Sequence, residues 1–354
     1  MSRFFSEKYR TLVPYVPGEQ PKDMQYIKLN TNESPYPVPQ TAQETVAREV
    51  EKLQLYPDPD GKELTDVIAE LCSVKGENVL LTNGSDETLN FAFMAFCDRE
   101  HPAAFADITY GFYSVFADLH GIPYEEIPLK QDLSIDANDY IGIGKTIFIA
   151  NPNAPTGLAL PVSDIEKIVR SNPQNVVVVD EAYVDFGGET VIPLTKKYDN
   201  LLVVRTFSKS RSMAGARLGF AVGAAELISD LHTLRYSTNP YNVNRLTMGA
   251  ALATLKNDAY NMENCKTIAG TRDETAKELK KLGFEATDSK TNFLFAKHKD
   301  IGGKELYLKL KQRGILVRHF DKERIRDYNR ITVGTPAQMQ ILIETIKSIL
   351  EEQP

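Results

Sequence analysis

Short apolar runs rich in β-branched residues alternate with longer helical stretches from about residue 60 onward. The run Val176 to Val179 has no polar alternation, which is typical of a central strand buried on both faces. Strands separated by helices need crossover connections, so the pattern predicts an α/β fold whose mostly parallel sheet is covered on both faces. Seven strands are expected, at 79–82, 103–107, 124–127, 146–150, 176–180, 201–207 and 218–222.

Both ends of the chain depart from this pattern. The first forty residues are rich in proline, which fixes φ and lacks an N–H donor, so we expect an extended arm there. After about residue 245 the sequence predicts a smaller α+β domain, with helices at 258–282, 303–312 and 336–351 and strands at 292–297, 315–320 and 330–333. The expected organisation is an arm at 1–40, a large domain at 41–245 and a small domain at 246–354.

Composition narrows the possible functions. The chain has 354 residues, 42% of them hydrophobic and 25% charged, as in ordinary globular enzymes. Its net charge of -7 argues against nucleic acid or an anionic membrane as the main partner. The N-terminus lacks the apolar core of a signal peptide, and no stretch approaches the roughly 18 apolar residues of a membrane span. We therefore expect a cytoplasmic protein. The histidines do not have the spacing of metal ligands, so we expect no structural metal.

Polar and aromatic residues gather where the expected strands end, the edge at which parallel sheets bind ligands. Ser85 and Asp86 open a helical run after the first strand, and free N–H groups at a helix start suit a phosphate. Simple helix capping by these two residues is the alternative. Tyr110 follows the second strand, where its ring could stack on a planar ligand or pack in the core. Asn153 lies in the proline-rich loop NPNAPTG.

Further strand-end side chains have complementary chemistry. Asp180 ends the valine strand, and a carboxylate buried there needs a cationic partner, either a protonated ring nitrogen or a structural arginine. Tyr183, three residues later, could reach a second substituent of the same ring. Lys209 could form a Schiff base and Arg217 could bind a phosphate, although a surface role is the alternative for the lysine. Together these groups match the requirements of pyridoxal 5′-phosphate (PLP).

The motifs NPNAPTG, DEAY, SKS and AGARLGF resemble those of fold-type I, class II PLP-dependent aminotransferases over nearly the whole chain. The segments VPYVPGEQ, KLNTNESPYP, YPDPDGKEL and NRITVGT are similar to the histidinol-phosphate aminotransferase family in particular. The resemblance implies that Lys209 is the catalytic, cofactor-linked lysine. It implies cofactor binding by Ser85, Asp86, Tyr110, Asp180, Tyr183, Ser208 and Arg217, and by Tyr56 from the neighbouring subunit of a homodimer. It implies substrate binding by Tyr15, Asn32, Arg318 and Arg330.

One position departs from the family pattern. In the commoner NPNNPTG version of the loop, the asparagine directly before PTG contacts the phenolic oxygen of the cofactor ring. This chain has Ala154 at that position, and we expect Asn153, one residue earlier, to compensate.

The resemblance also implies a reaction in two halves between small anionic amino and oxo substrates. Histidinol phosphate and 2-oxoglutarate would give imidazole-acetol phosphate and glutamate, a step of histidine biosynthesis, with Lys209 moving the α-proton. Three alternatives stay open: a threonine-phosphate decarboxylase, an aromatic amino-acid aminotransferase, and a regulator that keeps the fold and only binds a ligand. The intact Lys209 argues against the regulator.

Overall fold

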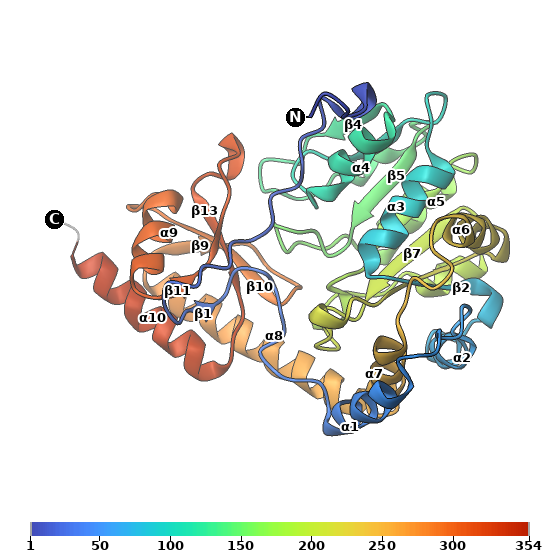
Figure 1. Ribbon diagram of the computed structural model, residues 1–354. Coiled ribbons are helices and arrows are strands. Elements are labelled where there is room, and N and C mark those ends of the chain that lie inside the picture. Colours follow the sequence, from blue (N-terminus) through green and yellow to red (C-terminus); the bar gives the residue numbers. More distant parts are fainter. Residues whose placement is uncertain (1, 353–354) are drawn as a thin grey trace.

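The computed structural model of the chain describes residues 2–352, which form a large and a small domain (Figure 1). The large domain contains a seven-stranded sheet with the order β2-β8-β7-β6-β5-β3-β4. β8 runs antiparallel to both of its neighbours, and the other strand pairs are parallel. The strands are β2 (Val79–Thr82), β3 (Ala103–Ala106), β4 (Tyr124–Ile127), β5 (Thr146–Ala150), β6 (Val177–Asp180), β7 (Leu201–Thr206) and β8 (Gly219–Gly223). The predicted α/β class and mostly parallel sheet are confirmed.

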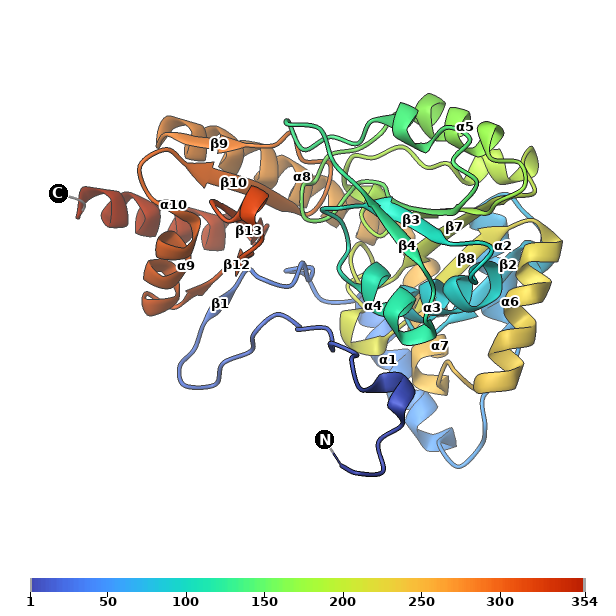
Figure 2. The ribbon, with the colours of Figure 1, turned by 90° about the horizontal axis from the view of Figure 1, so that it is seen from above.

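Helices cover both faces of this sheet (Figure 2). Successive residues of a strand point to opposite sides, so a strand of apolar residues must be covered on both faces. Val177 and Val179 share one core cluster with residues of α2 (Lys62–Leu71), α5 (Val162–Ser171) and α7 (Arg245–Leu255). Val178 and Phe148 share another with residues of α3 (Ser85–Phe96), α4 (Phe112–His120) and α6 (Ala225–Thr238). The unbroken valine run is therefore explained by burial on both faces.

The small domain is a four-stranded antiparallel sheet, in the order β12-β13-β10-β9, packed against helices. Its strands are β9 (Phe284–Ala286), β10 (Phe293–His298), β12 (Arg318–His319) and β13 (Tyr328–Thr332), and its helices are α8 (Asp258–Lys281), α9 (Gly303–Gln312) and α10 (Pro336–Glu351). The predicted α+β character is confirmed. The domain limits 41–245 and 246–354 stay a prediction, although α7, just beyond residue 245, buries Ala250 and Ala251 in the large-domain core.

The expected strand at 315–320 is wrong in one respect, because two separate strands form there. β11 (Ile315–Leu316) pairs in parallel with β1 (Ile27–Lys28) of the N-terminal arm, whereas β12 pairs antiparallel with β13. The chain changes partners at Val317, which lies between β11 and β12 and belongs to neither strand. A strand of only two residues that pairs with a distant segment leaves no periodic signal in the sequence. Neither β1 nor the break between β11 and β12 was therefore predicted.

The arm runs from the large domain to the small domain before it reaches α1 (Gln40–Glu49), as Figures 1 and 2 both show. Tyr15 stacks on Phe112 of the large domain, with ring centroids 4.2 Å apart. Arg318 of the small domain donates hydrogen bonds to the carbonyl oxygens of Val16 and Pro17, at 3.2 and 3.3 Å. The arm is therefore an extended segment that contacts both domains, apart from one short 3-10 turn at Glu7–Tyr9.

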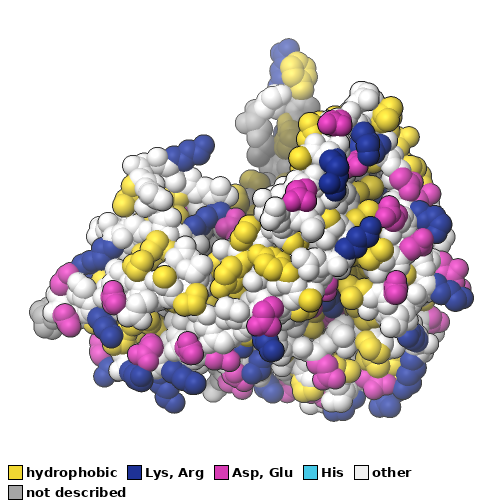
Figure 3. Space-filling model, turned by 90° about the horizontal axis from the view of Figure 1, so that it is seen from below, with side chains coloured by type: hydrophobic (Ala, Val, Ile, Leu, Met, Phe, Trp, Pro, Cys, Tyr) yellow, Lys and Arg dark blue, Asp and Glu magenta, His cyan; other side chains and the backbone are white. Residues whose placement is uncertain are grey.

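Figure 3 shows positive and negative side chains interspersed over one face of the molecule, without a stripe of basic residues on that face. A nucleic-acid surface of the usual kind would gather Lys and Arg along one face or helix. Within residues 2–352, no helix has the length and apolar character that crossing a membrane requires.

The aromatic cluster behind the sheet yields a stability prediction. Phe148 is buried and stacks on Phe93 with ring centroids 4.0 Å apart, and Tyr113 lies 5.8 Å away. We expect Phe148→Ala to lower the free energy of unfolding by about 3–5 kcal/mol, because it leaves a cavity that β5 and α3 cannot close. Denaturant titration followed by circular dichroism measures this change. The exposed Phe4 provides a control, since Phe4→Ala should change stability by less than about 0.5 kcal/mol.

Candidate active site

Two adjoining cavities lie at the carboxyl ends of the central strands, where sheets of this type bind ligands. The inner chamber, of about 390 Å³, is lined by the ends of β6 and β7 and the start of α3. The outer chamber, of about 460 Å³, lies between the arm and the two domains. Both chambers are lined by Thr31, Tyr110, Ala154, Tyr183 and Lys209. A larger groove of about 740 Å³, between α1, α2 and α7, contains none of the predicted site residues.

Asp180 lies in the inner chamber at the end of β6, where only 5% of its surface is exposed. Its carboxylate accepts hydrogen bonds from the hydroxyl of Tyr113, at 3.2 Å, and from the backbone N–H of Ala182, at 3.1 Å. Burial raises the pKa of Asp180 to about 7, although both hydrogen bonds oppose the change. No arginine or lysine forms an ion pair with this carboxylate among the described residues, so a cationic ligand group would stabilise it.

Tyr113 was not predicted as a site residue, although the motif TYGFY holds a second tyrosine three residues after Tyr110. Its position on the first turn of α4 directs the hydroxyl at Asp180, which is 67 residues away in the chain. Burial raises the pKa of Tyr113 well above its ordinary value, so the phenol keeps its proton and donates.

Lys209 follows β7 and reaches the boundary between the two chambers. Its amine donates a hydrogen bond to the backbone oxygen of Thr31 at 3.3 Å, and it lies 5.8 Å from the centroid of the Tyr183 ring. The arm therefore contributes directly to the surroundings of this amine. The contribution of Thr31 was not predicted, because a backbone oxygen carries no sequence signal.

The far end of the inner chamber combines a helix N-terminus with an arginine. Ser85 and Asp86 begin α3, and Arg217 donates to the carboxylate of Asp86 at 2.9 Å. The hydroxyl of Tyr110 donates to the other oxygen of Asp86 at 2.7 Å. Gly219 permits this arrangement, since an added Cβ would lie 2.4 Å from the backbone nitrogen of Ser85. Together with Ser208, which also lines this chamber, these groups can bind a phosphate through N–H, hydroxyl and guanidinium donors.

The outer chamber is lined by two arginines, Arg318 and Arg330. Arg330 lies above the rings of Phe293 and Phe320, at 5.4 and 5.7 Å, and donates to the backbone oxygen of Asn30 at 3.1 Å. Burial lowers the pKa of Arg330, and no Asp or Glu among residues 2–352 forms an ion pair with it. A half-buried guanidinium without a carboxylate partner is a strong site for an anionic ligand.

The two asparagines proposed for the site differ in their surroundings. The side-chain amide of Asn32 donates to the hydroxyl of Tyr183 at 2.9 Å and lines the outer chamber. Asn153 is not among the lining residues of either chamber, because its amide donates to Ile108 and Thr156 and accepts from Thr109, within the loop region. The structure therefore corrects one expectation: Asn153 stabilises the loop, and Asn32 is the amide next to the Tyr183 hydroxyl.

Tyr56 does not reach the chambers of its own chain. It is 78% exposed and stacks on Tyr241, with ring centroids 4.6 Å apart. Apart from Asn153 and Tyr56, the predicted site residues, from the arm and from both domains, line the chambers.

One cavity lies at the carboxyl ends of the strands of a mostly parallel sheet. It is surrounded by a buried carboxylate, a lysine, a phenol and the N-terminus of a helix that can bind an anion. This combination is typical of an α/β transferase whose active site is built around a lysine side chain. The chain matches the family model described as "Aminotransferase class I and II" over residues 24–346, and it belongs to this family. The prediction of a PLP-dependent aminotransferase is thereby confirmed.

Individual relatives agree with this assignment. The chain is 49% identical to a histidinol-phosphate aminotransferase of Brachyspira hyodysenteriae, covering 99% of this chain and 100% of the relative. It is 48% identical to one from Marinomonas sp., with coverage of 99% and 100%. The crystal structure of the histidinol-phosphate aminotransferase from Clostridium acetobutylicum superposes with a TM-score of 0.85 at 22% identity, covering 92% of this chain and 99% of that one, which shows the shared fold.

The raised pKa of Asp180 predicts a dependence of stability on pH. In the unfolded chain an aspartate titrates near pH 4, whereas in the folded protein Asp180 titrates near pH 7. Between these values the unfolded state loses its proton first, so the contribution of Asp180 to stability falls as the pH rises through this window. We expect Asp180→Asn to make the cofactor-free protein more stable relative to the parent at about pH 8 than at about pH 5. Denaturant titration at both pH values measures the difference.

Asp185→Asn is a matched control, because Asp185 is also buried but its two arginine partners lower its pKa to about 2. The stability supplied by Asp185 is fully present above pH 4 or so, and hence Asp185→Asn should destabilise the protein equally at both pH values. An Asp180→Asn effect that is likewise independent of pH would contradict the raised pKa.

Proposed function

We propose that the protein transfers the amino group of histidinol phosphate to 2-oxoglutarate, with PLP as its cofactor and Lys209 as the catalytic residue. The observation that carries the proposal is that Lys209 lines both chambers, between the buried carboxyl group of Asp180 and the half-buried guanidinium of Arg330, neither of which has an ion-pair partner among residues 2–352. A ligand pair with a cationic ring on one side and an anionic group on the other would satisfy both. The full-length relatives support histidinol phosphate as the substrate.

The inner chamber fits the proposed cofactor. Asp180 would accept a hydrogen bond from the protonated ring nitrogen, and Tyr110 would stack on the ring. The hydroxyl of Tyr183 accepts a hydrogen bond from Asn32 and would donate one to the phenolic oxygen of the cofactor ring. An asparagine at position 154 would otherwise contact this oxygen. The phosphate would lie at the start of α3, held by Ser85, Asp86, Ser208 and Arg217. When bound, the cofactor supplies an electron sink for the charge that develops on the α-carbon of the substrate.

Lys209 would transfer the proton. With the substrate bound, the amine of Lys209 would take the proton from the α-carbon as a general base and would return it as a general acid. The hydrogen bond to the backbone oxygen of Thr31 keeps the amine at the boundary between the chambers, where both the α-carbon and the cofactor lie within reach. Asp180 would keep the ring nitrogen protonated during this step because it is an ionised, desolvated partner.

The outer chamber would bind the anionic end of the substrate. Arg330 and Arg318, together with Tyr15, line it, and the same two guanidiniums can pair with a carboxylate of glutamate or with a phosphate. The substrates are small soluble metabolites, and we infer a cytoplasmic location for the reaction.

This arrangement predicts a phosphate preference. Histidinol leaves the arginines of the outer chamber unpaired, so we expect histidinol phosphate to exceed histidinol by at least ~10²-fold in kcat/KM. Arg318→Ala should remove much of this difference while leaving PLP binding almost unchanged, because Arg318 does not line the inner chamber. Steady-state kinetics with 2-oxoglutarate as the acceptor, on a panel of histidinol phosphate, histidinol, threonine phosphate, phenylalanine and tyrosine, provides the measurement.

The same panel separates the alternatives. Equal use of histidinol and its phosphate, or a preference for phenylalanine, would favour an aromatic aminotransferase. Release of carbon dioxide from threonine phosphate without amino transfer would favour the decarboxylase. Incubation with glutamate alone should convert the cofactor spectrum to that of its aminated form, and no conversion would leave the decarboxylase or a ligand-binding regulator.

We infer further that the active unit is a homodimer with shared sites. Tyr56 is exposed, and near it the segment from Val50 to Leu55 exposes three apolar side chains, Val50, Leu53 and Leu55. In a symmetric dimer such a surface would be covered, and Tyr56 would reach the cofactor phosphate of the neighbouring chain.

Subunit mixing tests this arrangement. Tyr56→Ala and Lys209→Ala should each have low activity, for different reasons. After subunit exchange, a mixed dimer has one site with an intact Lys209 and an intact Tyr56 from the partner chain, so activity should rise above that of either variant alone. Exchange is verified by native mass spectrometry, and unchanged activity after verified exchange would count against shared sites.

A further inference from the structure

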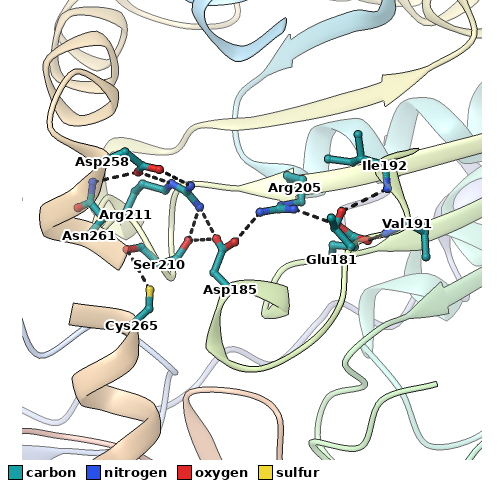
Figure 4. Close-up of polar contacts among 11 residues, drawn as sticks. Glu181, Asp185, Val191, Ile192, Arg205, Ser210, Arg211, Asp258, Asn261 and Cys265 are labelled. Atoms are coloured by element: carbon teal, nitrogen blue, oxygen red, sulfur yellow. Dashed lines mark hydrogen bonds and ion pairs between the residues drawn. The ribbon is translucent and has the colours of Figure 1, made fainter. Parts of the chain in front are cut away.

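Five charged side chains of alternating sign form a row of ion pairs close to the site residues in sequence (Figure 4). We call it the charge ladder, and it consists of Glu181, Arg205, Asp185, Arg211 and Asp258. None of the five is a lining residue of either chamber. The ladder therefore does not contact a ligand in the site, and the proposed reaction does not use it.

The first half of the ladder joins β6 to β7. Arg205 of β7 donates to Glu181 at 3.0 Å with one nitrogen and to Asp185 at 2.7 Å with another. Glu181 also accepts from the hydroxyl of Thr190, at 2.7 Å, and from the backbone N–H of Val191, at 2.6 Å. Its oxygens are thus saturated by donors, as a fully buried carboxylate requires.

The second half joins the loop after β7 to α8. Asp185 accepts from the hydroxyl of Ser210, at 2.6 Å, and from the guanidinium of Arg211. Arg211 in turn forms a bidentate pair with Asp258, at 3.2 and 3.1 Å, on the first residue of α8. Asp185 is the centre of the ladder, because it alone contacts both arginines.

Three of the five ladder residues lie within two positions of a site residue in the sequence. Glu181 directly follows Asp180, Asp185 is two residues after Tyr183, and Ser210 and Arg211 follow Lys209. In each case the site residue lines the inner chamber, whereas its neighbour does not line it and is bonded within the ladder. The ladder thus fixes the two loops that carry the acid, the phenol and the amine.

We propose that Asp185 is a positioning residue, which sets the distance of Lys209 from Asp180 and Tyr183 by holding both loops through Arg205, Ser210 and Arg211. This inference rests on the proposed function of Lys209. Stability alone is a weak reason for such a row, because buried ion pairs often contribute no more than apolar residues of the same shape. Their geometry is directional, however, and a shift of about 1 Å at a reacting group can lower a rate by about 10²-fold.

The experiment compares the parent with Asp185→Asn, which keeps the shape of the side chain but removes the charge. The cofactor-free proteins are mixed with PLP and quenched with borohydride at intervals, and peptide mapping gives the rate at which Lys209 is labelled. We expect this rate to fall at least ~10-fold and kcat about 10²-fold, with KM for glutamate nearly unchanged, because the outer chamber is untouched. The melting temperature of each cofactor-free protein is measured alongside.

Glu166→Gln is the matched control. Glu166 also joins distant segments, accepting hydrogen bonds from Lys197 at 2.6 Å and Tyr198 at 2.8 Å, but it lies outside the ladder and the chambers. Its labelling rate and kcat should equal those of the parent. If Asp185→Asn does not fold, Ser210→Ala replaces it, since this change removes only the hydroxyl that links the neighbour of Lys209 to Asp185.

The outcomes distinguish the inference from the function it rests on. A lower melting temperature with normal labelling of Lys209 and normal kcat would mean that the ladder is only structural, and the inference would be overturned while the proposed function stands. A parent protein that is not labelled on Lys209 would overturn both. Slower labelling in Asp185→Asn or Ser210→Ala, at a temperature where both remain folded, would support the positioning role.

Discussion

A carboxylate at the end of a strand that is buried on both faces is the constraint on which the rest of the site depends. Asp180 lies at this position with only two hydrogen bonds, and burial raises its pKa to about 7. An aspartate in this environment is stable as an anion only beside a cation. The surrounding elements are arranged accordingly: Tyr113 supplies a donor that cannot lose its proton, and Lys209, although close enough to line the same chamber, is bonded to Thr31 instead.

The outer chamber presents the opposite condition. Arg330 is a half-buried cation above two aromatic rings, and its hydrogen bond goes to a backbone oxygen. The two charges stand on either side of Lys209 and do not neutralise each other directly. A bound molecule that places a cation near Asp180 and an anion near Arg330 would remove both desolvation penalties at once, which explains why the amine lies between them. The charges of the site thus favour ligands that carry a cation at one end and an anion at the other, whatever their shape.

The sequence predicted the elements and residues whose signals are local. The strands of the large sheet follow from apolar runs between helices, and Asp180, Tyr183, Lys209 and Arg217 follow from their places at strand ends. What was not predicted depends on distant contacts: the β1–β11 pairing, the approach of Tyr113 to Asp180, and the backbone oxygen of Thr31 at Lys209. The sequence shows Ala154 in place of the family's asparagine, and from the sequence we expected the adjacent Asn153 to take over the contact of that asparagine. Only the folded chain brings Asn32, about 120 positions earlier, to the hydroxyl of Tyr183.

The two halves of the site are held by interactions of different strength. The inner chamber rests on the central sheet and on the charge ladder, whose members are buried and bonded at several atoms each. The outer chamber also depends on the arm, where Val16 and Pro17 accept two exposed hydrogen bonds from Arg318, whereas Asn32 forms buried hydrogen bonds with Thr332 and Asn292. Exposed hydrogen bonds open at a lower free energy than buried networks do. Movement of the arm near Val16 and Pro17 would therefore cost less than displacement of Thr31 and Asn32, which contact Lys209 and Tyr183, so substrates of different shape could enter while the central groups keep their places.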